Sequence, residues 1–333
     1  MRAQPEKKTQ TILLKIESLT FNYKSQNAFK GLRNISFEIK KGEFISLLGK
    51  SGSGKTSLLK CIFGMEDLQH GKIMFLEEQV KGPSYQLLPG HPGMSLVSQD
   101  FYVLDHHSVR ENIAEKLIGW SDHHKDLRID ELLRVLQLSA FEQKKAKELS
   151  SGQRQRLSIA RALADFPKLL LLDEPFSNLD AALKDKILNY IRKEAAKKHS
   201  AVIMVTHHAE DTLKFSDQIF ILKEGKIMQK GSPEKVFFQP KSLETALLFG
   251  KAFRVKNFPG NIKILRPEYL QESESNDGDI KLKVEENNFC GGCFEVSGND
   301  EQKNQISFYS ENPVAHDRRE IYLKLRKGIS GKV

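Results

Sequence analysis

Hydrophobic positions along the chain recur in patterns that each indicate one kind of element. Short runs rich in apolar residues predict strands near residues 35–39, 44–48, 95–97, 169–172 and 202–205. Apolar residues at helical spacing predict helices between these strands, among them residues 57–63, 108–113, 131–136 and 150–163. Strands that alternate with helices favour an α/β fold built on a mostly parallel sheet.

The pattern changes beyond about residue 250. Alternating apolar and polar residues at 280–284 and 321–325 predict small antiparallel strands, as in an OB-like half-barrel. A short helix near residues 231–237 precedes the change. We therefore expect two domains, an α/β domain over residues 12–240 and a smaller β-rich domain over residues 250–333.

Composition places the chain among soluble globular proteins, with 333 residues, 39% of them hydrophobic and 29% charged. No apolar run approaches the length of about eighteen residues that would span a bilayer. Residues 1–8 lack the apolar stretch of a signal peptide, so we expect a cytosolic location.

The net charge of +9 would suit a nucleic-acid or membrane-surface partner. Its lysines are scattered, without the interleaved aromatic residues of a single-strand binder, which favours a solvated surface. We therefore expect no nucleic-acid partner.

A phosphate-binding loop follows the strand at 44–48. It fits the pattern G-x-x-x-x-G-K-[ST] with Gly49, Lys50, Ser51, Gly52, Ser53, Gly54, Lys55 and Thr56, and Ser57 opens the next helical run. Glycines let successive N–H groups face the phosphates of a nucleotide, and the helix N-terminus adds its positive end. Lys55 should reach the β- and γ-phosphates, and the Thr56 hydroxyl should bind Mg²⁺.

Two further segments carry chemistry. The apolar run at 169–172 ends in Asp173, placed to hold Mg²⁺, and in Glu174, placed to act as the general base toward water. Ser150 precedes an amphipathic helix as its N-cap. The N–H groups at that helix start form an anion site with no phosphate assigned to it within the same chain.

These motifs resemble those of ATP-binding cassette (ABC) proteins. The segment Leu149–Gln153 is similar to the family signature that contacts ATP in trans, through Ser150, Ser151, Gly152 and Gln153; Ser151 stands where glycine is usual. Gln99 resembles the Q-loop residue that senses Mg²⁺, and Asp180 the D-loop residue at the dimer interface. His207 resembles the switch histidine, with His208 where aspartate is usual. Tyr23 resembles the aromatic residue that stacks on adenine, although strand packing would explain it equally.

The resemblance implies an ATPase with ATP and Mg²⁺ as cofactors, working as a homodimer at the cytoplasmic face of the membrane. It implies a P-loop cassette whose helical subdomain, inserted after Gln99 from residue 101 to 148 and reaching about 160, meets a separate integral membrane permease. A periplasmic or lipid-anchored solute-binding protein would act indirectly. Residues 266–268 resemble the start of the accessory (TOBE-like) domain of importer ATPases.

The motifs as a set lean toward importers of ferric iron or polyamines. A soluble ABC ATPase acting on nucleic acid or ribosomes is the alternative, and a cassette that regulates instead of transporting is a third.

Two groups of residues remain open. Metal ligation by His106, His107, His123 and His124 competes with their being exposed loop histidines. Cys290 and Cys293 could bind a metal or form a redox pair, or could be incidental thiols in a hairpin turn.

Overall fold

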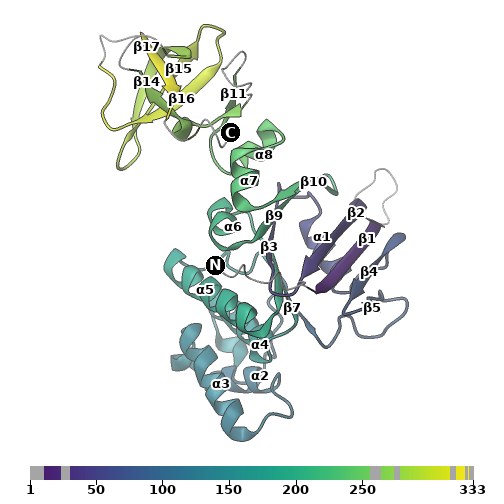
Figure 1. The fold of residues 1–333 in the computed structure, drawn as a ribbon. Helices are drawn as coiled ribbons and strands as arrows, with labels where there is room; N and C mark the ends of the chain where they lie inside the picture. The colour runs from purple at the N-terminus through teal and green to yellow at the C-terminus, as the bar shows by residue number, and fades with distance from the viewer. Residues whose placement is uncertain are drawn as a thin grey trace, which may run out of the picture. The chain divides into compact units, whose positions relative to one another are not determined.

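The computed structural model in Figure 1 describes residues 11–23, 31–255, 264–273, 278–315, 320–326 and 329. By their internal contacts these form two compact units, residues 1–233 and residues 234–333. Within the described part of the chain, no helix is both long and apolar enough to cross a bilayer.

A six-stranded sheet forms the centre of the first unit. Its strands are β3 (Phe44–Leu48), β6 (Met94–Val97), β7 (Leu169–Asp173), β8 (Ala201–Val205), β9 (Gln218–Lys223) and β10 (Lys226–Gly231). They lie in the order β10-β9-β3-β8-β7-β6, and every pairing is parallel except that of β10 with β9. All residues of β3, β7 and β8 are buried, because the two faces of these strands pack into two separate hydrophobic cores.

A second sheet in this unit is antiparallel throughout. It consists of β1 (Ile12–Asn22), β2 (Gly31–Lys40), β4 (His70–Phe75) and β5 (Glu78–Gln79), in the order β2-β1-β4-β5. The expectation that residues 35–39 join the parallel sheet is therefore wrong. Ile35, Phe37 and Ile39 are buried while the residues between them are exposed, which is typical of a strand with one solvent-facing side.

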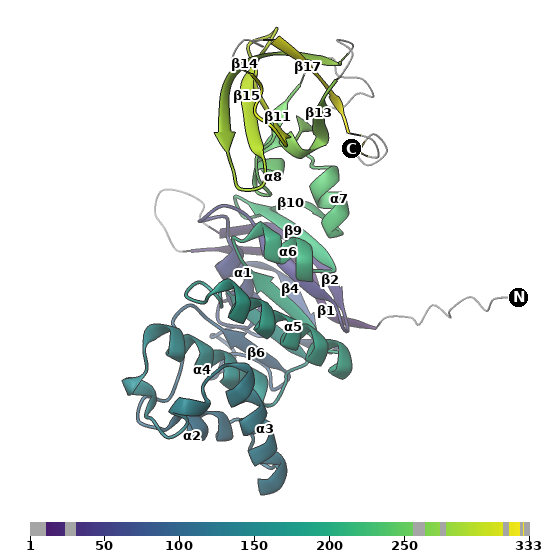
Figure 2. The same cartoon turned by 90° about the vertical axis from the view of Figure 1, so that its left-hand side faces the viewer.

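Helices follow the parallel strands along the chain. They are α1 (Lys55–Ile62) after β3, α5 (Ala181–Lys198) after β7 and α6 (Ala209–Phe215) after β8. Between β6 and β7 come α2 (Val109–Ala114), α3 (Asp122–Val135), the short 3₁₀ turns η1 (Ser139–Phe141) and η2 (Ala146–Glu148), and α4 (Ser151–Ala164). Figure 2 shows α2, α3 and α4 grouped together. The predicted helices near 57–63, 108–113, 131–136 and 150–163 are confirmed.

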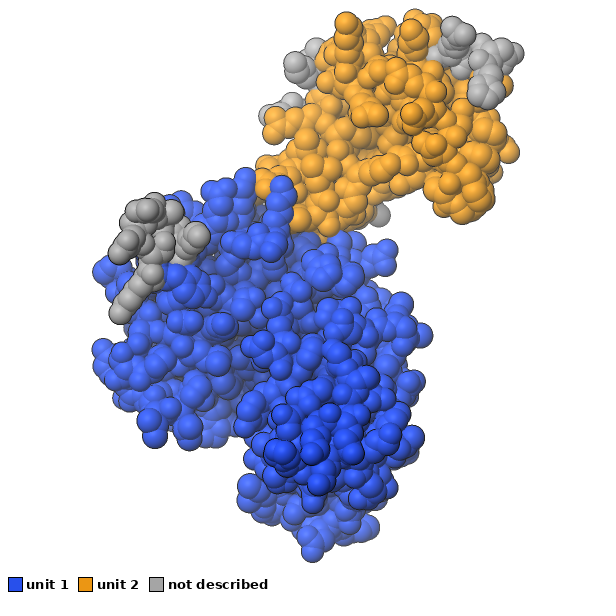
Figure 3. All heavy atoms as spheres, turned by 180° about the vertical axis from the view of Figure 1, so that it is seen from behind, with its two compact units in different colours: residues 1–233 blue, residues 234–333 orange. Residues whose placement is uncertain are grey.

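The second unit, coloured separately in Figure 3, is mostly β-structure. It contains α7 (Pro233–Phe238, whose first residue belongs to the first unit), α8 (Leu243–Leu247), β11 (Phe253–Arg254), β12 (Ile264–Leu265), η4 (Pro267–Tyr269), β13 (Leu270–Glu272), β14 (Ile280–Phe289), β15 (Phe294–Asp300), β16 (Gln305–Ser310) and β17 (Glu320–Leu325). The antiparallel order β13-β17-β14-β15-β16 curls until its two edge strands, β13 and β16, come into contact. The prediction of small antiparallel strands in an OB-like half-barrel is confirmed.

Candidate nucleotide-binding site

The loop between β3 and α1 needs glycine at two points. Gly54, the N-cap residue of α1, has φ +104°, in the region that residues with side chains rarely adopt. A Cβ atom on Gly49 would lie 2.2 Å from the Leu222 carbonyl oxygen of β9. The glycines therefore allow the loop to wrap the N-terminus of α1 while packing closely on the neighbouring strand.

Lys55, the first residue of α1, reaches back into this loop. Its side chain is only 7% exposed, and its ammonium group donates to the carbonyl oxygens of Gly49 at 2.7 Å and Lys50 at 3.0 Å. Burial lowers the pKa of Lys55, and the nearby carboxylates of Glu174 and Asp173 oppose that change. A mostly buried cation above an N-terminal helix turn is placed to meet phosphate oxygens.

Two predicted Mg²⁺ ligands are in direct contact. The Thr56 hydroxyl donates to Oδ1 of Asp173 at 3.2 Å. Burial raises the pKa of Asp173, which the Thr56 hydrogen bond partly offsets. A desolvated carboxylate beside a hydroxyl, with the Gln99 amide lining the same cavity as Thr56, is the hard oxygen donor set that Mg²⁺ prefers, so these residues fit the ion.

Glu174 and His207 meet at the carboxyl ends of adjacent parallel strands, β7 and β8. Oε2 of Glu174 lies 3.6 Å from Nδ1 of His207. Glu174 has φ +49°, a strained conformation for a residue with a side chain, and its N–H donates to the Val205 carbonyl oxygen at 3.1 Å. The His208 ring lies 4.2 Å from that of His207. In this backbone conformation Glu174 lies at the strand ends, beside the phosphate loop.

A cavity of about 740 Å³ joins most of these groups. Of the residues predicted to contact ATP, those that line it are Tyr23, Ser51, Gly52, Gly54, Lys55, Thr56, Ser57, Gln99 and Glu174. The Tyr23 hydroxyl is hydrogen-bonded to the Ser57 hydroxyl at 3.0 Å, which attaches its ring to the start of α1. Its ring also packs edge-on against Phe21 at 4.8 Å, so the two interpretations of Tyr23, ligand contact and strand packing, are compatible.

One wall of the cavity was not predicted from the sequence. It is formed by Gly31, Arg33, Glu224 and Gly225. Gly225 donates its N–H to the Ser53 carbonyl oxygen at 3.0 Å and accepts from the Arg33 N–H at 2.8 Å. A Cβ atom on Gly225 would lie 2.0 Å from the Gly31 carbonyl oxygen. Only the Glu-Gly dipeptide between two apolar runs marked this turn, and it carries no sign of a ligand.

The signature residues lie apart from this cavity, since none of Ser150, Ser151, Gly152 and Gln153 lines it. The Ser150 side chain accepts from the Gln153 N–H at 3.4 Å, and the Gln153 side chain accepts from the Ser150 N–H at 2.9 Å. This capping box confirms Ser150 as the N-cap of α4, where Ser150 and Ser151 are exposed and Gly152 and Gln153 are half-buried.

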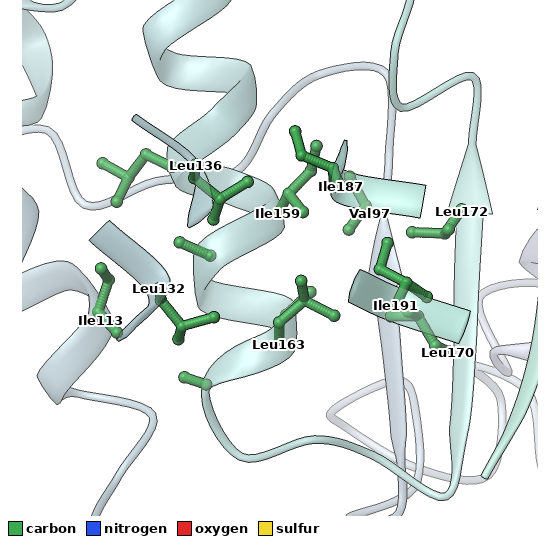
Figure 4. Packing of buried hydrophobic residues seen from close by; sticks show 14 of the residues in the cluster. Val97, Ile113, Leu132, Leu136, Ile159, Leu163, Leu170, Leu172, Ile187 and Ile191 are labelled. Carbon is green, nitrogen blue, oxygen red and sulfur yellow. The ribbon is translucent and has the colours of Figure 1, made fainter. Parts of the chain in front are cut away.

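The body of α4 is held firmly behind that exposed turn. Figure 4 shows Ile159 and Leu163 of α4 between two leucines on one side, Leu132 of α3 and Leu136 just after it, and residues of β7 and α5 on the other. At its start, the buried Gln155 donates to the Ser177 hydroxyl at 3.3 Å. The signature turn is thus fixed to the sheet and to the loop that leads to α5.

Asp180 also has a local role. Its carboxylate accepts from the Leu183 N–H at 2.9 Å and caps α5. The side chain itself is exposed. The predicted position at a dimer interface therefore stays a prediction.

Among the residues that were left open, His106, His107, His123 and His124 are all exposed. His123 and His124 lie in the first turn of α3, so describing them as loop histidines is wrong. Cys290 and Cys293 do lie in a hairpin turn, between β14 and β15.

Residues 32–177 match the ABC transporter family. The chain is 32% identical to the spermidine/putrescine import ATP-binding protein PotA of Clostridioides difficile, over 84% of this chain and 87% of that protein. The chain belongs to the ABC transporter family of ATP-binding proteins. It is also 29% identical to the Fe(3+) ions import ATP-binding protein FbpC of Fusobacterium nucleatum, over 93% of this chain and 92% of that protein.

Solved structures of ABC cassettes agree. The dimeric post-hydrolysis state of the cassette MJ0796, bound to ADP and Pi, aligns with a TM-score of 0.60 at 27% identity, over 66% of this chain and 99% of that one. CbiO1 of Clostridium perfringens, part of the transporter complex CbiONQ, aligns with a TM-score of 0.58 at 26% identity, over 68% of this chain and 91% of its own. This ABC protein is therefore an ATPase, and its first unit has the cassette fold.

Proposed function

We propose that this ABC protein is the ATP-hydrolysing subunit of an importer that moves ferric iron or a polyamine through a separate permease. The observation that carries the proposal is the extent of the match to FbpC of F. nucleatum, which covers 93% of this chain and so reaches beyond the cassette into residues 234–333. The relatives named above are an Fe(3+) importer subunit and a spermidine/putrescine importer subunit, and both solutes are cations.

ATP would occupy the 740 Å³ cavity. Its adenine would lie against the Tyr23 ring, and its phosphates would lie on the N–H groups of residues 49–57. Lys55 would exchange its carbonyl contacts for β- and γ-phosphate oxygens, which are stronger partners for a desolvated ammonium group. Thr56, Asp173 and Gln99 would hold Mg²⁺, which neutralises charge on the phosphate oxygens.

Glu174 would orient the attacking water and accept its proton. His207, 3.6 Å from the Glu174 carboxylate, would hold that carboxylate in place and donate to the γ-phosphate. The strained backbone at Glu174 supports this assignment, because such strain gathers where a side chain must be aimed.

The exposed turn at Ser150–Gln153 would complete the site of a second copy of the chain. Its N–H groups and the positive end of α4 would face the γ-phosphate of the partner's ATP, with Asp180 near the interface. Two such composite sites form in a homodimer, so that ATP closes the dimer and hydrolysis releases it.

The permease would dock on the helical region near Gln99 and receive that motion. Tyr102, which follows closely in the chain and is 73% exposed, offers an apolar contact there. The protein would then sit at the cytoplasmic face of the membrane, with a periplasmic or lipid-anchored solute-binding protein delivering the cargo to the permease.

The test is a pull-down of the tagged protein from detergent-solubilised membranes, with every co-purifying chain identified. We expect a polytopic permease, and the solute-binding protein associated with it would separate iron from polyamine. Recovery of only soluble proteins or nucleic acid would contradict the importer assignment and leave the ATPase activity standing.

A further inference from the structure

Two thiols lie at the tip of the β14–β15 hairpin, and the proposed function does not use them. Cys290 and Cys293 face each other across Gly291 and Gly292, and the Cys290 N–H donates to the Cys293 carbonyl oxygen at 2.9 Å. Their Sγ atoms are 3.2 Å apart and share a hydrogen bond. The hairpin therefore brings two free thiols into direct contact.

The backbone here suits a bond between them. The pairing of β14 with β15 reaches Phe289 and Phe294, directly beside the two cysteines, and the hydrogen bond from the Cys290 N–H to the Cys293 carbonyl oxygen lies one position beyond it. The two sulfur atoms need to approach by only about 1 Å more. No neighbouring atom lies within 4 Å of a Cβ position on Gly291 or Gly292, so the turn can adjust without disturbing the core.

Two further groups lie beside the pair. The hydrogen bond with Cys293 is the main cause that raises the pKa of Cys290. Lys251, bound to Glu295 at 2.6 Å, lies close enough to Cys290 for the two groups to interact electrostatically. Either sulfur can donate the hydrogen bond between them, so either thiol can supply the attacking thiolate while the other stays beside it.

A metal site is less well supported. Within the described residues no group of three or more His, Cys, Asp or Glu side chains could hold a metal ion. Two thiolates fill only half of a tetrahedral zinc site. The pair is better suited to redox chemistry, because a thiolate is the nucleophile that attacks an oxidant and a second thiol lies beside it to form the disulfide.

We propose that Cys290 and Cys293 form a modification site at which hydrogen peroxide closes a reversible disulfide. The thiolate of one cysteine attacks one peroxide oxygen, the O–O bond breaks, and the departing hydroxide takes a proton to leave as water. The second cysteine then attacks the resulting sulfenic sulfur; the S–S bond forms, the S–O bond breaks, and the leaving hydroxide takes the proton of the second thiol as a second water. Two electrons pass from the thiols to the peroxide, and a dithiol reductant reverses the change.

The test treats the reduced full-length protein with hydrogen peroxide and maps its cysteine peptides by mass. We expect the single peptide that carries both Cys290 and Cys293 to lose two hydrogens as an internal disulfide forms, and to recover fully with a dithiol. Cys61 serves as the internal control, because it is buried and burial raises its pKa. Unchanged thiols, or oxygen added to each cysteine without an internal disulfide, would overturn the proposal.

Single variants test whether each thiol needs the other. Cys290→Ser and Cys293→Ser should each still react with peroxide and stop at a sulfenic acid on the remaining cysteine, which a dione reagent traps. The absence of a trapped sulfenic acid in both variants would overturn the proposed route. Both positions are at least partly exposed at a hairpin tip, so neither change removes core packing.

Discussion

The phosphate-loop side and the signature side of the cassette are built in opposite ways. On the phosphate-loop side, Lys55 is nearly buried, two carbonyl oxygens hold its ammonium group, and a cavity of about 740 Å³ lies within the first unit. On the signature side, Ser150 and Ser151 are exposed and the helix start caps itself. The phosphate-loop side gathers its groups around a cavity within one chain, whereas the proposed role of the signature side depends on a second copy of the chain.

The largest effect should come from Glu174→Gln. Removing the general base should lower the ATP hydrolysis rate by roughly 10²–10⁴-fold while ATP binding persists, so closed dimers accumulate. Steady-state ATPase assays and size-exclusion chromatography with ATP would measure both. Glu224→Gln is the matched control, because Glu224 lines the same cavity and, within the part of the chain that the structure describes, forms no hydrogen bond or ion pair with Asp173 or His207. Near-normal turnover in Glu174→Gln, or an equal loss in Glu224→Gln, would refute the role of Glu174.

Lys55→Ala should weaken nucleotide binding roughly ten- to a hundredfold, because a charge-assisted hydrogen bond contributes about 1.5–3 kcal/mol. Titration with a fluorescent ATP analogue would measure the change. Lys60→Ala, at the far end of α1, removes the same charge and should bind normally. Tight binding by Lys55→Ala would show that the phosphates lie elsewhere.

Sequence alone predicted the phosphate-loop side well because its signals are local. The glycines, Lys55 and Thr56 lie within one strand-loop-helix unit, whose geometry follows from neighbouring residues. The Glu224–Gly225 wall could not be predicted, since it reaches the loop only through the pairing of β9 with β3. The placement of residues 35–39 in the parallel sheet was wrong for a different reason. Apolar and polar residues alternate there, which is typical of an antiparallel strand with one solvent-facing side and not of a fully buried parallel strand.

Tyr23→Ala should weaken ATP binding toward the lower end of the 1–3 kcal/mol typical of base–aromatic stacking, because the ring is 41% exposed. Tyr23→Phe keeps the ring and loses only the hydrogen bond to Ser57, so it should cost under about 1 kcal/mol. Calorimetric titration of both variants would compare them. Equal losses would assign the effect to the hydroxyl and leave the ring as strand packing.

The smallest expected effect distinguishes a role of Ser150 in capping α4 from a role in ATP hydrolysis. Ser150→Ala and Ser108→Ala each remove the serine of a capping box, at α4 and α2, so each should cost about 1 kcal/mol of unfolding free energy. Only Ser150→Ala should also lower ATPase activity, because in the proposed dimer only Ser150 would face the partner's nucleotide. Urea denaturation and ATPase assays on both variants would measure this. Matching ATPase rates would reduce Ser150 to a structural cap.

On the signature side, the sequence could predict the helix cap but not the molecule that the exposed residues contact. The N-cap at Ser150 was predictable because the serine and Gln153 have the spacing of a capping box. Asp180, which directly precedes the helical residue Ala181, is an equally favourable N-cap residue type, so its capping of α5 was predictable as well. What these exposed groups bind depends on a surface that a single chain does not supply.

The most direct test of the composite site asks whether the two sides of one chain meet each other or a partner. In a Glu174→Gln chain with Cys290 and Cys293 replaced by serine, Ser51→Cys and Ser151→Cys place one thiol on each side. A short bifunctional thiol reagent is added with ATP, and the products are resolved by mass. The account predicts covalently linked dimers that require ATP; internally bridged monomers would contradict it.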